Sequence, residues 1–278
     1  MKVWFTEEWL DGFVIAVQIK SVVYTQRTKY QELAIFDTVE FGRMLTLDNV
    51  IQTTEKYEYL YHESLAHVPL FSHENPEHVL IIGGGDGGTL REAMRHPEIK
   101  QATMVDIDGE VIEASKKYLP LWNTGFSDPR ATVLIEDGLK FVATTDEKFD
   151  VVLVDSTDPE GPGEALFMPE FYASIAKILK PGGMLCAQTE SPISTPGMVR
   201  DIYQRIAKVF PVAKLYTAPV PSYPGGWWSF TCGSFGRDPE KPLRKPADSW
   251  NLKFYSPEIH DRVFVLNPKL KRDVGIMD

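Results

Sequence analysis

The sequence predicts an α/β fold in which a doubly wound parallel sheet, covered by helices on both faces, follows a small antiparallel β domain. From Pro76 onward, continuous apolar runs of strand length alternate with helical patterns, which is typical of a sheet buried on both faces. The first of these runs is followed by the glycine-rich segment Gly83-Gly-Gly-Asp-Gly-Gly88 and then by a helical pattern. Ahead of Pro76, short alternating runs are separated by turn-forming residues, which indicates antiparallel strands.

The first 75 residues are predicted to form an N-terminal antiparallel β domain, 1–54, and a connecting helix with its linker, 55–75. From Glu55 to Val68, aromatic and aliphatic residues recur at helical spacing, and Pro69 is expected to end this helix. The apolar runs that predict strands in the β domain fall at 13–19, 33–36 and 44–47.

The larger domain is predicted over 76–235, and a C-terminal extension follows over 236–278. A further helix is expected over 199–210, ahead of two aromatic-rich terminal strands. The proline-containing stretch 236–249 predicts an irregular surface segment. The parallel strands are expected at 78–82, 102–106, 131–135, 149–155 and 184–188, and the terminal, partly antiparallel strands at 212–217 and 227–232.

The composition is that of an ordinary globular protein, with 43% hydrophobic and 24% charged residues. Glu7 and Glu8 stand where a signal peptide would continue its apolar run, and no segment approaches the roughly 20 apolar residues of a membrane span. We therefore expect a cytoplasmic protein that does not contact a membrane. Cys186 and Cys232 lie in apolar runs and are expected to be buried free thiols. The net charge of −10 disfavours nucleic acid and favours cationic partners if the acids cluster at a site.

The glycine-rich segment and the acid that ends the next strand together suggest an adenosine ligand. Gly83, Gly85 and Gly88 have the G-x-G-x-x-G spacing between a strand and a helix, which lets a ligand approach the backbone. Asp106 follows about 20 residues later, where a carboxylate can accept hydrogen bonds from both ribose hydroxyls. Either feature alone could be purely structural.

Asp86, inside the glycine-rich segment, indicates which kind of adenosine ligand fits. The N-terminus of a helix binds phosphate through free amides and a positive dipole, and a carboxylate there opposes an anionic pyrophosphate. NAD is therefore disfavoured, whereas a sulfonium or alkylammonium group would be attracted. Asp86 can also be interpreted as a helix cap, which is compatible with ligand binding.

Two later strands are also followed by acids. Asp137 and Gly138 can offer a carboxylate and a backbone amide to the edge of an adenine, although a plain helix cap is the alternative for Asp137. Asp155 and Asp158 follow the fourth parallel strand, at the sheet edge where ligands of open α/β folds bind. Proline and glycine follow this pair, which predicts a loop that bears carboxylates.

Together, these motifs resemble those of the spermidine synthases, a family of polyamine aminopropyltransferases. The segment Leu179-Lys-Pro-Gly-Gly183 also resembles an element of S-adenosylmethionine-dependent methyltransferases, so the resemblance implies a Rossmann-like, methyltransferase-type sheet. The likeness runs from about Trp4 to about Ser234, with six separated motifs in the same order. Beyond the acidic motifs, it includes Tyr30-Gln31, Leu47-Asp48, Ile51-Gln52, Tyr61-His62-Glu63 and Val220-Pro-Ser-Tyr-Pro224.

The resemblance implies a role for each matching residue. The nucleoside would have its ribose held by Gln31 and Asp106, and Asp86 would hold the aminopropyl ammonium group. Asp155 would be the general base. Residues implied to bind the cosubstrate, decarboxylated S-adenosylmethionine, are Gln31, Gly83, Gly85, Asp86, Asp106, Asp137, Gly138 and Pro162, the last beside the adenine. Residues implied to bind the amine are Tyr61, His62, Asp86, Asp155, Asp158 and Tyr223; without the family, Tyr61 and His62 would be interpreted as core packing.

The implied reaction moves propylamine to putrescine and yields spermidine and 5'-methylthioadenosine by direct displacement, without a metal or a cofactor. We expect desolvation and the charge of Asp158 to raise the pKa of Asp155 so that it can accept a proton. Agmatine, cadaverine or a longer polyamine is an alternative acceptor. Two other hypotheses are a methyltransferase that uses intact S-adenosylmethionine and a silent adenosine or polyamine sensor.

One segment departs from the family pattern. Members often have Tyr-Pro-Ser-Gly where this chain has Tyr223-Pro-Gly-Gly226, followed by Trp227-Trp228, which leaves the shape of the far amine pocket open. The resemblance also implies a homodimer or homotetramer.

Overall fold

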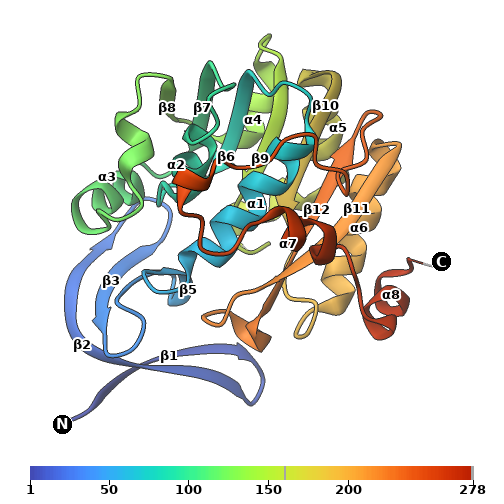
Figure 1. Ribbon diagram of the computed structural model, residues 1–278. Helices are drawn as coiled ribbons and strands as arrows, with labels where there is room; N and C mark the ends of the chain where they lie inside the picture. The colour runs from blue at the N-terminus through green and yellow to red at the C-terminus, as the bar shows by residue number, and fades with distance from the viewer. Residues whose placement is uncertain (160, 277–278) are drawn as a thin grey trace.

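Two sheets joined by one long helix make up the fold (Figure 1). The computed structural model describes residues 1–159 and 161–276. The first sheet is antiparallel with its strands in chain order, and the second has seven strands flanked by helices on both faces. The predicted α/β sheet and the antiparallel β domain that precedes it are therefore both present.

The first strand of the N-terminal sheet was not among the strands predicted from apolar runs. In this strand, β1, Phe5 and Glu7 are buried while Thr6 and Glu8 are exposed. A buried acid occupies a position that an apolar residue usually takes, and so it hides the period-two pattern. The sheet consists of β1 (Val3–Leu10), β2 (Phe13–Arg27), β3 (Glu32–Thr38), β4 (Arg43–Leu47) and β5 (Val50–Thr54).

Helix α1 (Glu58–Ser72) connects the two sheets and is buried along nearly its whole length. It begins three residues later than predicted, because the Tyr57 N–H donates to the Thr54 carbonyl in a turn at 3.1 Å. It also continues past Pro69, which was expected to end it. Proline in the last turn removes one hydrogen bond, and burial of Phe71 in the core offsets that loss.

The second sheet has the strand order β11-β12-β10-β9-β6-β7-β8. The five strands from β10 to β8 are parallel, and β12 runs antiparallel between β10 and β11, as predicted for the terminal strands. The strands are β6 (His78–Gly83), β7 (Gln101–Asp106), β8 (Ala131–Ile135), β9 (Phe149–Asp155), β10 (Leu179–Gln188), β11 (Val212–Pro219) and β12 (Trp227–Ser234).

Alternate residues of the central strands face opposite helical layers. On β6, Val79 and Ile81 pack in the cluster that contains α1 and α2, whereas Leu80 and Ile82 pack with α4, α5 and α6. The α-helices are α2 (Gly88–Met94), α3 (Gly109–Tyr118), α4 (Gly138–Thr144), α5 (Pro169–Ile178), α6 (Pro196–Val209), α7 (Pro257–Val263) and α8 (Pro268–Val274). The short 3-10 helices are η1 (Thr124–Ser127), η2 (Gly161–Phe167), η3 (Pro224–Gly226) and η4 (Asp248–Trp250).

The winding of the sheet reverses at β6, which has β7 on one side and β9 on the other. At such a point, the loops after neighbouring strands separate and open a crevice at the carboxyl ends of the strands. The N-terminal sheet reaches this edge through a cluster in which Leu33, Leu45 and Leu47 pack against Val111 and Trp122. One wall of the crevice can therefore come from the N-terminal sheet.

The C-terminal extension begins irregularly and ends in two helices. Residues 236–249 contain neither a strand nor an α-helix, as predicted, although the Leu243 N–H donates to the Phe71 carbonyl at 2.8 Å. Both cysteines, Cys186 and Cys232, are buried free thiols, which confirms that prediction. Within the described chain, no helix combines the length and the apolar character needed to cross a membrane.

Candidate active site

A cavity of about 290 Å³ lies at the carboxyl ends of β6, β7 and β9, in the crevice that the strand order predicts. Tyr30, Leu45 and Leu47 of the N-terminal sheet and its loops form part of its wall. The structure brings together at this cavity most of the site residues predicted from the sequence: Gln31, Tyr61, His62, Gly83, Gly85, Asp86, Asp106, Asp137, Gly138, Asp155 and Tyr223. The placement of the Pro162 side chain lies outside the described part of the structure.

Asp158 does not line this cavity but a smaller one of about 20 Å³ that adjoins it. The residues that line both are Gln52, Tyr61, Ser156 and Tyr223. We call the two spaces the large cavity and the small cavity.

The glycine-rich loop requires glycine for steric reasons at the site itself. Gly83 has a φ of +80°, and a Cβ there would lie 2.1 Å from the Asp155 carbonyl oxygen. A Cβ on Gly85 would lie 2.8 Å from Asp106 Oδ2. Glycine at these two positions therefore allows the loop to lie directly against the two acids that end β9 and β7.

Asp106 lies at the end of β7 with its carboxylate held by backbone groups. Oδ1 accepts a hydrogen bond from the Asp108 N–H at 2.8 Å, and burial raises the pKa of Asp106 to about 6. Gln31 is held nearby because its Nε2 donates to Asp108 Oδ2 at 3.0 Å. This corner of the large cavity thus presents a carboxylate and an amide on a fixed frame.

Asp137 and Gly138 lie where β8 leads into α4. Asp137 is the N-cap of that helix, and its Oδ1 accepts from the Leu139 N–H at 2.8 Å, so the helix-cap alternative holds. Both residues also line the large cavity. A Cβ on Gly138 would lie 2.7 Å from Ile82 Cγ2, so glycine keeps the helix close to the sheet.

Asp155 ends β9 with both carboxylate oxygens occupied. Tyr61 Oη donates to Oδ1 at 2.8 Å, and Thr89 Oγ1 donates to Oδ2 at 2.6 Å. Burial, followed by the charge of Asp86, raises the pKa of Asp155. The predicted direction is correct, but the acid named for it was wrong: the main charge is that of Asp86, on the neighbouring loop, and not that of Asp158.

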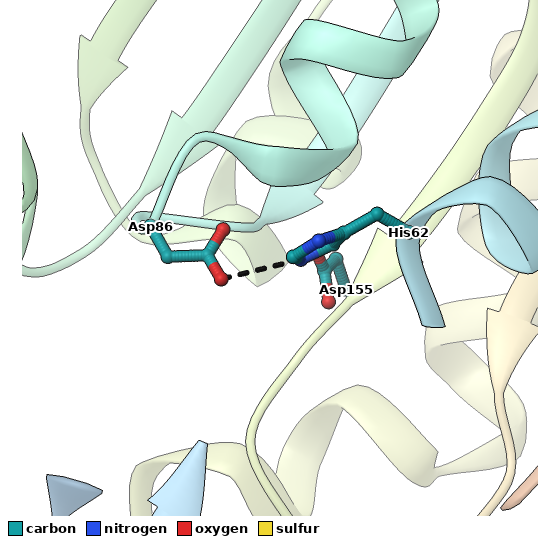
Figure 2. Close-up of side chains that lie close together, drawn as sticks. All are labelled: His62, Asp86 and Asp155. Atoms are coloured by element: carbon teal, nitrogen blue, oxygen red, sulfur yellow. Dashed lines mark ion pairs between the residues drawn. The ribbon is translucent and has the colours of Figure 1, made fainter. Parts of the chain in front are cut away.

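His62 and Asp86 form an ion pair in the wall of the large cavity, beside Asp155 (Figure 2). His62 Nε2 lies 3.2 Å from Asp86 Oδ2, and His62 Nδ1 lies 2.7 Å from Glu58 Oε2. Burial alone would lower the pKa of His62, but the carboxylates of Asp86 and Glu58 outweigh it and raise this pKa to about 10. His62 is therefore protonated at neutral pH.

The same trio is the one group of side chains, within the described residues, whose arrangement could accept a metal ion. One ligand atom each from His62, Asp86 and Asp155 lies within 4.8 Å of the others. A ligating histidine must be neutral, so the raised pKa of His62 disfavours a metal here.

The small cavity contains residues that the sequence analysis did not identify. Glu7 of β1 is 2% exposed, and its Oε2 accepts from the Ile51 N–H at 2.8 Å. Glu7 Oε1 and Trp9 Nε1 have no hydrogen-bond partner among the described residues. Burial raises the pKa of Glu7 to about 7, and the charge of Asp158 adds to this. The available signal was the alternation of Phe5, Glu7 and Trp9, which places three side chains on one face of a strand.

Trp228 shapes the other side of the small cavity, in the segment that departs from the family pattern. Its Nε1 donates to Gln188 Oε1 at 3.1 Å, and its ring meets that of Tyr223 with centroids 4.7 Å apart. Trp227 lines neither cavity. Tyr223 Oη donates to the Gln52 carbonyl, which joins this side to β5.

Comparison with known proteins identifies the family of this chain. The family model of the spermine/spermidine synthase domain matches residues 58–240, and that of the spermidine synthase tetramerisation domain matches residues 3–55. The polyamine aminopropyltransferase of Bacillus subtilis (strain 168) is 45% identical over 273 residues, 98% of this chain and 99% of the relative. That of Desulforudis audaxviator (strain MP104C) is 48% identical over 266 residues, 96% of this chain and 97% of the relative.

Solved structures of the same family have the same fold. A crystal structure of spermidine synthase in complex with the transition state analogue AdoDATO is 40% identical, with a TM-score of 0.96 over 99% of this chain and 96% of that chain. Spermidine synthase from Thermotoga maritima is 39% identical, with a TM-score of 0.92 over 99% and 95%. The predicted family and fold class are confirmed: this chain belongs to the spermidine synthase family of polyamine aminopropyltransferases.

Proposed function

We propose that this enzyme transfers propylamine from decarboxylated S-adenosylmethionine to putrescine, with Asp155 as the general base. The observation that carries the proposal is the pair of adjoining cavities. They share Tyr61, whose hydroxyl donates to the Asp155 carboxylate at 2.8 Å. An adenosine group fits the large cavity, and the acids of the small cavity, Glu7 and Asp158, can receive the far ammonium group of a narrow aliphatic diamine.

In this proposal the large cavity binds the nucleoside. Asp106 and Gln31 hold the ribose, Asp137 and Gly138 meet the adenine beside Pro162, and Gly83 and Gly85 let the ligand approach the loop. Asp86 accepts a hydrogen bond from the aminopropyl ammonium group. The crystal structure that is 40% identical contains a transition state analogue, AdoDATO, which supports binding of both substrates side by side.

The chemistry requires a base because the acceptor starts as a cation. An alkylamine resembles lysine, with a pKa of about 10.4, so only about one molecule in 2,500 is the free base at pH 7. Asp155 takes the ammonium proton, and the freed nitrogen attacks the propyl carbon next to sulfur. The carbon–sulfur bond breaks, its electron pair stays on sulfur, and neutral 5'-methylthioadenosine leaves.

The acids also favour the transition state. Positive charge moves from sulfur to the attacking nitrogen as the new bond forms, so carboxylates near that nitrogen stabilise the transition state more than the ground state. Asp155 and Asp158 supply this effect, and Tyr61, His62 and Tyr223 line the amine path. Because the pKa of Asp155 is raised by burial and by Asp86, it accepts a proton more readily than an ordinary aspartate.

The test is to offer the purified enzyme decarboxylated and intact S-adenosylmethionine separately, each with putrescine, cadaverine, agmatine or spermidine. Mass spectrometry would identify the nucleoside and amine products. Spermidine and 5'-methylthioadenosine, formed fastest with putrescine, are expected from the decarboxylated donor alone. A preference for another amine would overturn the acceptor assignment, and S-adenosylhomocysteine from the intact donor would indicate a methyltransferase.

We also propose a homodimer or homotetramer formed through the N-terminal sheet. The tetramerisation domain model matches residues 3–55, and large apolar side chains there are exposed, including Val3, Trp4, Val14 and Val22. Large exposed apolar side chains favour association where they gather on one surface. Light scattering coupled to size exclusion should give two or four times 31.4 kDa, and a monomer at micromolar concentration would contradict the proposal.

A further inference from the structure

A row of buried charges of alternating sign leads away from the large cavity between α1 and α2. It runs from Asp86 to His62 at 3.2 Å, from His62 to Glu58 at 2.7 Å and from Glu58 to Arg91 at 2.8 Å. The side chains of Glu58 and Arg91 are 4% and 12% exposed. Neither residue lines the large or the small cavity, so neither has a part in the proposed chemistry.

From this arrangement we infer that Glu58 and Arg91 are positioning residues that act through His62: they hold its ring with both N–H groups donating, and so fix the Asp86 carboxylate toward the aminopropyl ammonium group. The inference rests on the proposed function, which gives Asp86 that ligand. It adds two residues, outside the cavity, that determine how well one part of the cosubstrate is bound.

Arg91 holds Glu58 at both oxygens. Its Nη1 donates to Oε1 at 3.1 Å and its Nη2 donates to Oε2 at 2.8 Å, and such a two-point contact fixes the carboxylate plane. Arg91 is itself oriented by Glu92, whose Oε1 accepts from Nε at 2.6 Å. Glu58 therefore has one orientation, with Oε2 directed at His62 Nδ1.

The carboxylates of Glu58 and Asp86 determine the protonation state of the His62 ring. An ionised carboxylate only accepts hydrogen bonds, so Nδ1 facing Glu58 and Nε2 facing Asp86 must both carry a proton. The charged groups that face the ring are all acids: Glu58 on the same helix, Asp86 from the loop after β6, and Asp155 from β9. The ring of Tyr61 meets it edge-on, with centroids 5.5 Å apart. The cation Arg91, on α2, pairs with Glu58 at 2.8 Å.

The His62 ring packs against Gly88. A Cβ at that position would lie 2.2 Å from His62 Cε1, so the imidazole lies directly against the first turn of α2. The Gly88 N–H also donates to Asp86 Oδ1 at 2.8 Å. One carboxylate oxygen is thus held by the backbone and the other by His62, which leaves further lone pairs on both for a cationic ligand.

Glu58 also balances the charge that His62 brings to the site. An imidazolium beside Asp86 would repel the aminopropyl ammonium group unless an acid behind it compensates. Without the charge of Glu58, His62 either loses one proton and holds Asp86 by a weaker, uncharged hydrogen bond, or remains as an uncompensated cation. Both outcomes weaken binding of the ammonium group and leave the adenosine contacts unchanged, which separates this role from a general effect on folding.

The test compares two nucleosides that share adenosine but differ in the propylamine group. Glu58→Gln keeps the shape of the side chain and removes its charge. Calorimetry should show that decarboxylated S-adenosylmethionine binds about 10-fold more weakly to the variant, the effect of losing a hydrogen bond between charged groups, while 5'-methylthioadenosine binds as before. The protonation of His62 is followed in the ligand-free enzyme by NMR of its ring nitrogens, whose signals are assigned by their absence in His62→Gln. These signals should titrate between pH 6 and 9 in Glu58→Gln but not in the wild type.

Glu63→Gln is the matched control. Glu63 follows His62 on the same helix and is 2% exposed, but its carboxylate accepts backbone N–H groups of Lys253, Phe254 and Tyr255 at 2.9, 2.8 and 2.7 Å. Its loss should lower stability without changing the ratio of the two nucleoside affinities or the titration of His62.

An unchanged affinity ratio in Glu58→Gln, or a His62 titration identical to that of the wild type, would overturn the inference. If Glu58→Gln does not fold, Arg91→Lys can be tested in its place, because it keeps the positive charge but not the two-point contact. It should lower the ratio of the affinity for decarboxylated S-adenosylmethionine to that for 5'-methylthioadenosine about 3-fold. Failure of the wild type to transfer propylamine would instead remove the proposed function. The dependence of the His62 titration on Glu58 requires no turnover and would still decide the positioning role.

Discussion

The large and small cavities adjoin, yet they are built in different ways. The acids of the large cavity are all hydrogen-bonded by the protein. Backbone N–H groups hold three of them, Asp86 by Gly88, Asp106 by Asp108 and Asp137 by Leu139, each at 2.8 Å, and side-chain hydroxyls hold Asp155. In the small cavity, Glu7 has one oxygen without a partner among the described residues, and burial raises its pKa to about 7. The large cavity is therefore organised before its ligand binds, whereas the small one leaves a buried acid for a cation to satisfy.

The comparison predicts that the two cavities can be disabled separately, and that their boundary is the most sensitive point. Asp155→Asn should lower kcat by about 10²- to 10⁴-fold, because the acceptor ammonium loses its base. The Kd of 5'-methylthioadenosine should change little, since the ribose and adenine contacts remain. Asp150→Asn is a control on the same strand, because Asp150 pairs with Lys180 at 2.8 Å away from both cavities. Near-normal turnover in Asp155→Asn would remove this residue from the mechanism.

A second change should affect the large cavity alone. Asp106→Asn removes the charge at the proposed ribose site, and we expect 5'-methylthioadenosine to bind about 10- to 100-fold more weakly. The KM for putrescine, measured at saturating cosubstrate, should stay within about 2-fold of the wild type, because no Asp106 contact reaches the small cavity. Equal losses for both substrates would show that the two cavities are coupled.

The large and small cavities also differ in how far they could be predicted from the sequence. The large cavity was predictable because Gly83, Asp106, Asp137 and Asp155 each stand within two residues after an apolar run, and the carboxyl ends of neighbouring parallel strands meet at one edge. Each motif could thus be placed from local pattern and one topological rule. The family resemblance then linked Gln31, Tyr61 and Tyr223, which are distant in sequence, to the same place.

The small cavity could not be predicted in this way. It is lined by β1, β5, α1, the loop after β9, the end of β10, and the chain from Tyr223 to the start of β12, and no local pattern indicates that these segments meet. Glu7 looks like a surface charge in the sequence and is buried only because β1 extends the N-terminal sheet. For the same reason, nearness in sequence pointed to Asp158 as the charge that raises the pKa of Asp155, although in the structure the main charge is that of Asp86.

The unpaired, buried Oε1 of Glu7 allows a test of this difference between the cavities. Glu7→Gln preserves the shape of the small cavity and removes its least satisfied charge, so the KM for putrescine should rise about 10-fold. Binding of 5'-methylthioadenosine should be unchanged, because Glu7 does not line the large cavity. Glu8→Gln, an exposed neighbour on β1, is the matched control and should behave as the wild type. An unaltered KM in Glu7→Gln would mean that the diamine does not reach this acid.

The smallest expected effect concerns pH. Burial raises the pKa of Glu7 from 4.5 to about 7, so the carboxylate takes up a proton as the pH falls through 7, and only the ionised form attracts an ammonium group. Between pH 8.5 and 6.5 the ionised fraction falls about 4-fold, and the affinity for putrescine should fall by the same factor. The affinity for putrescine is measured by calorimetry with 5'-methylthioadenosine bound, which prevents turnover. Subtracting the pH profile of affinity in Glu7→Gln removes the contribution of Asp155.

Proton release gives a second measure of the ionisation of Glu7. Since a bound cation stabilises the carboxylate, binding of putrescine near pH 7 should release a proton, which would appear as a binding heat that depends on the buffer. A profile that is the same in both proteins would mean that Glu7 is already ionised in the free enzyme, and the contrast between an organised and an unsatisfied cavity would no longer hold.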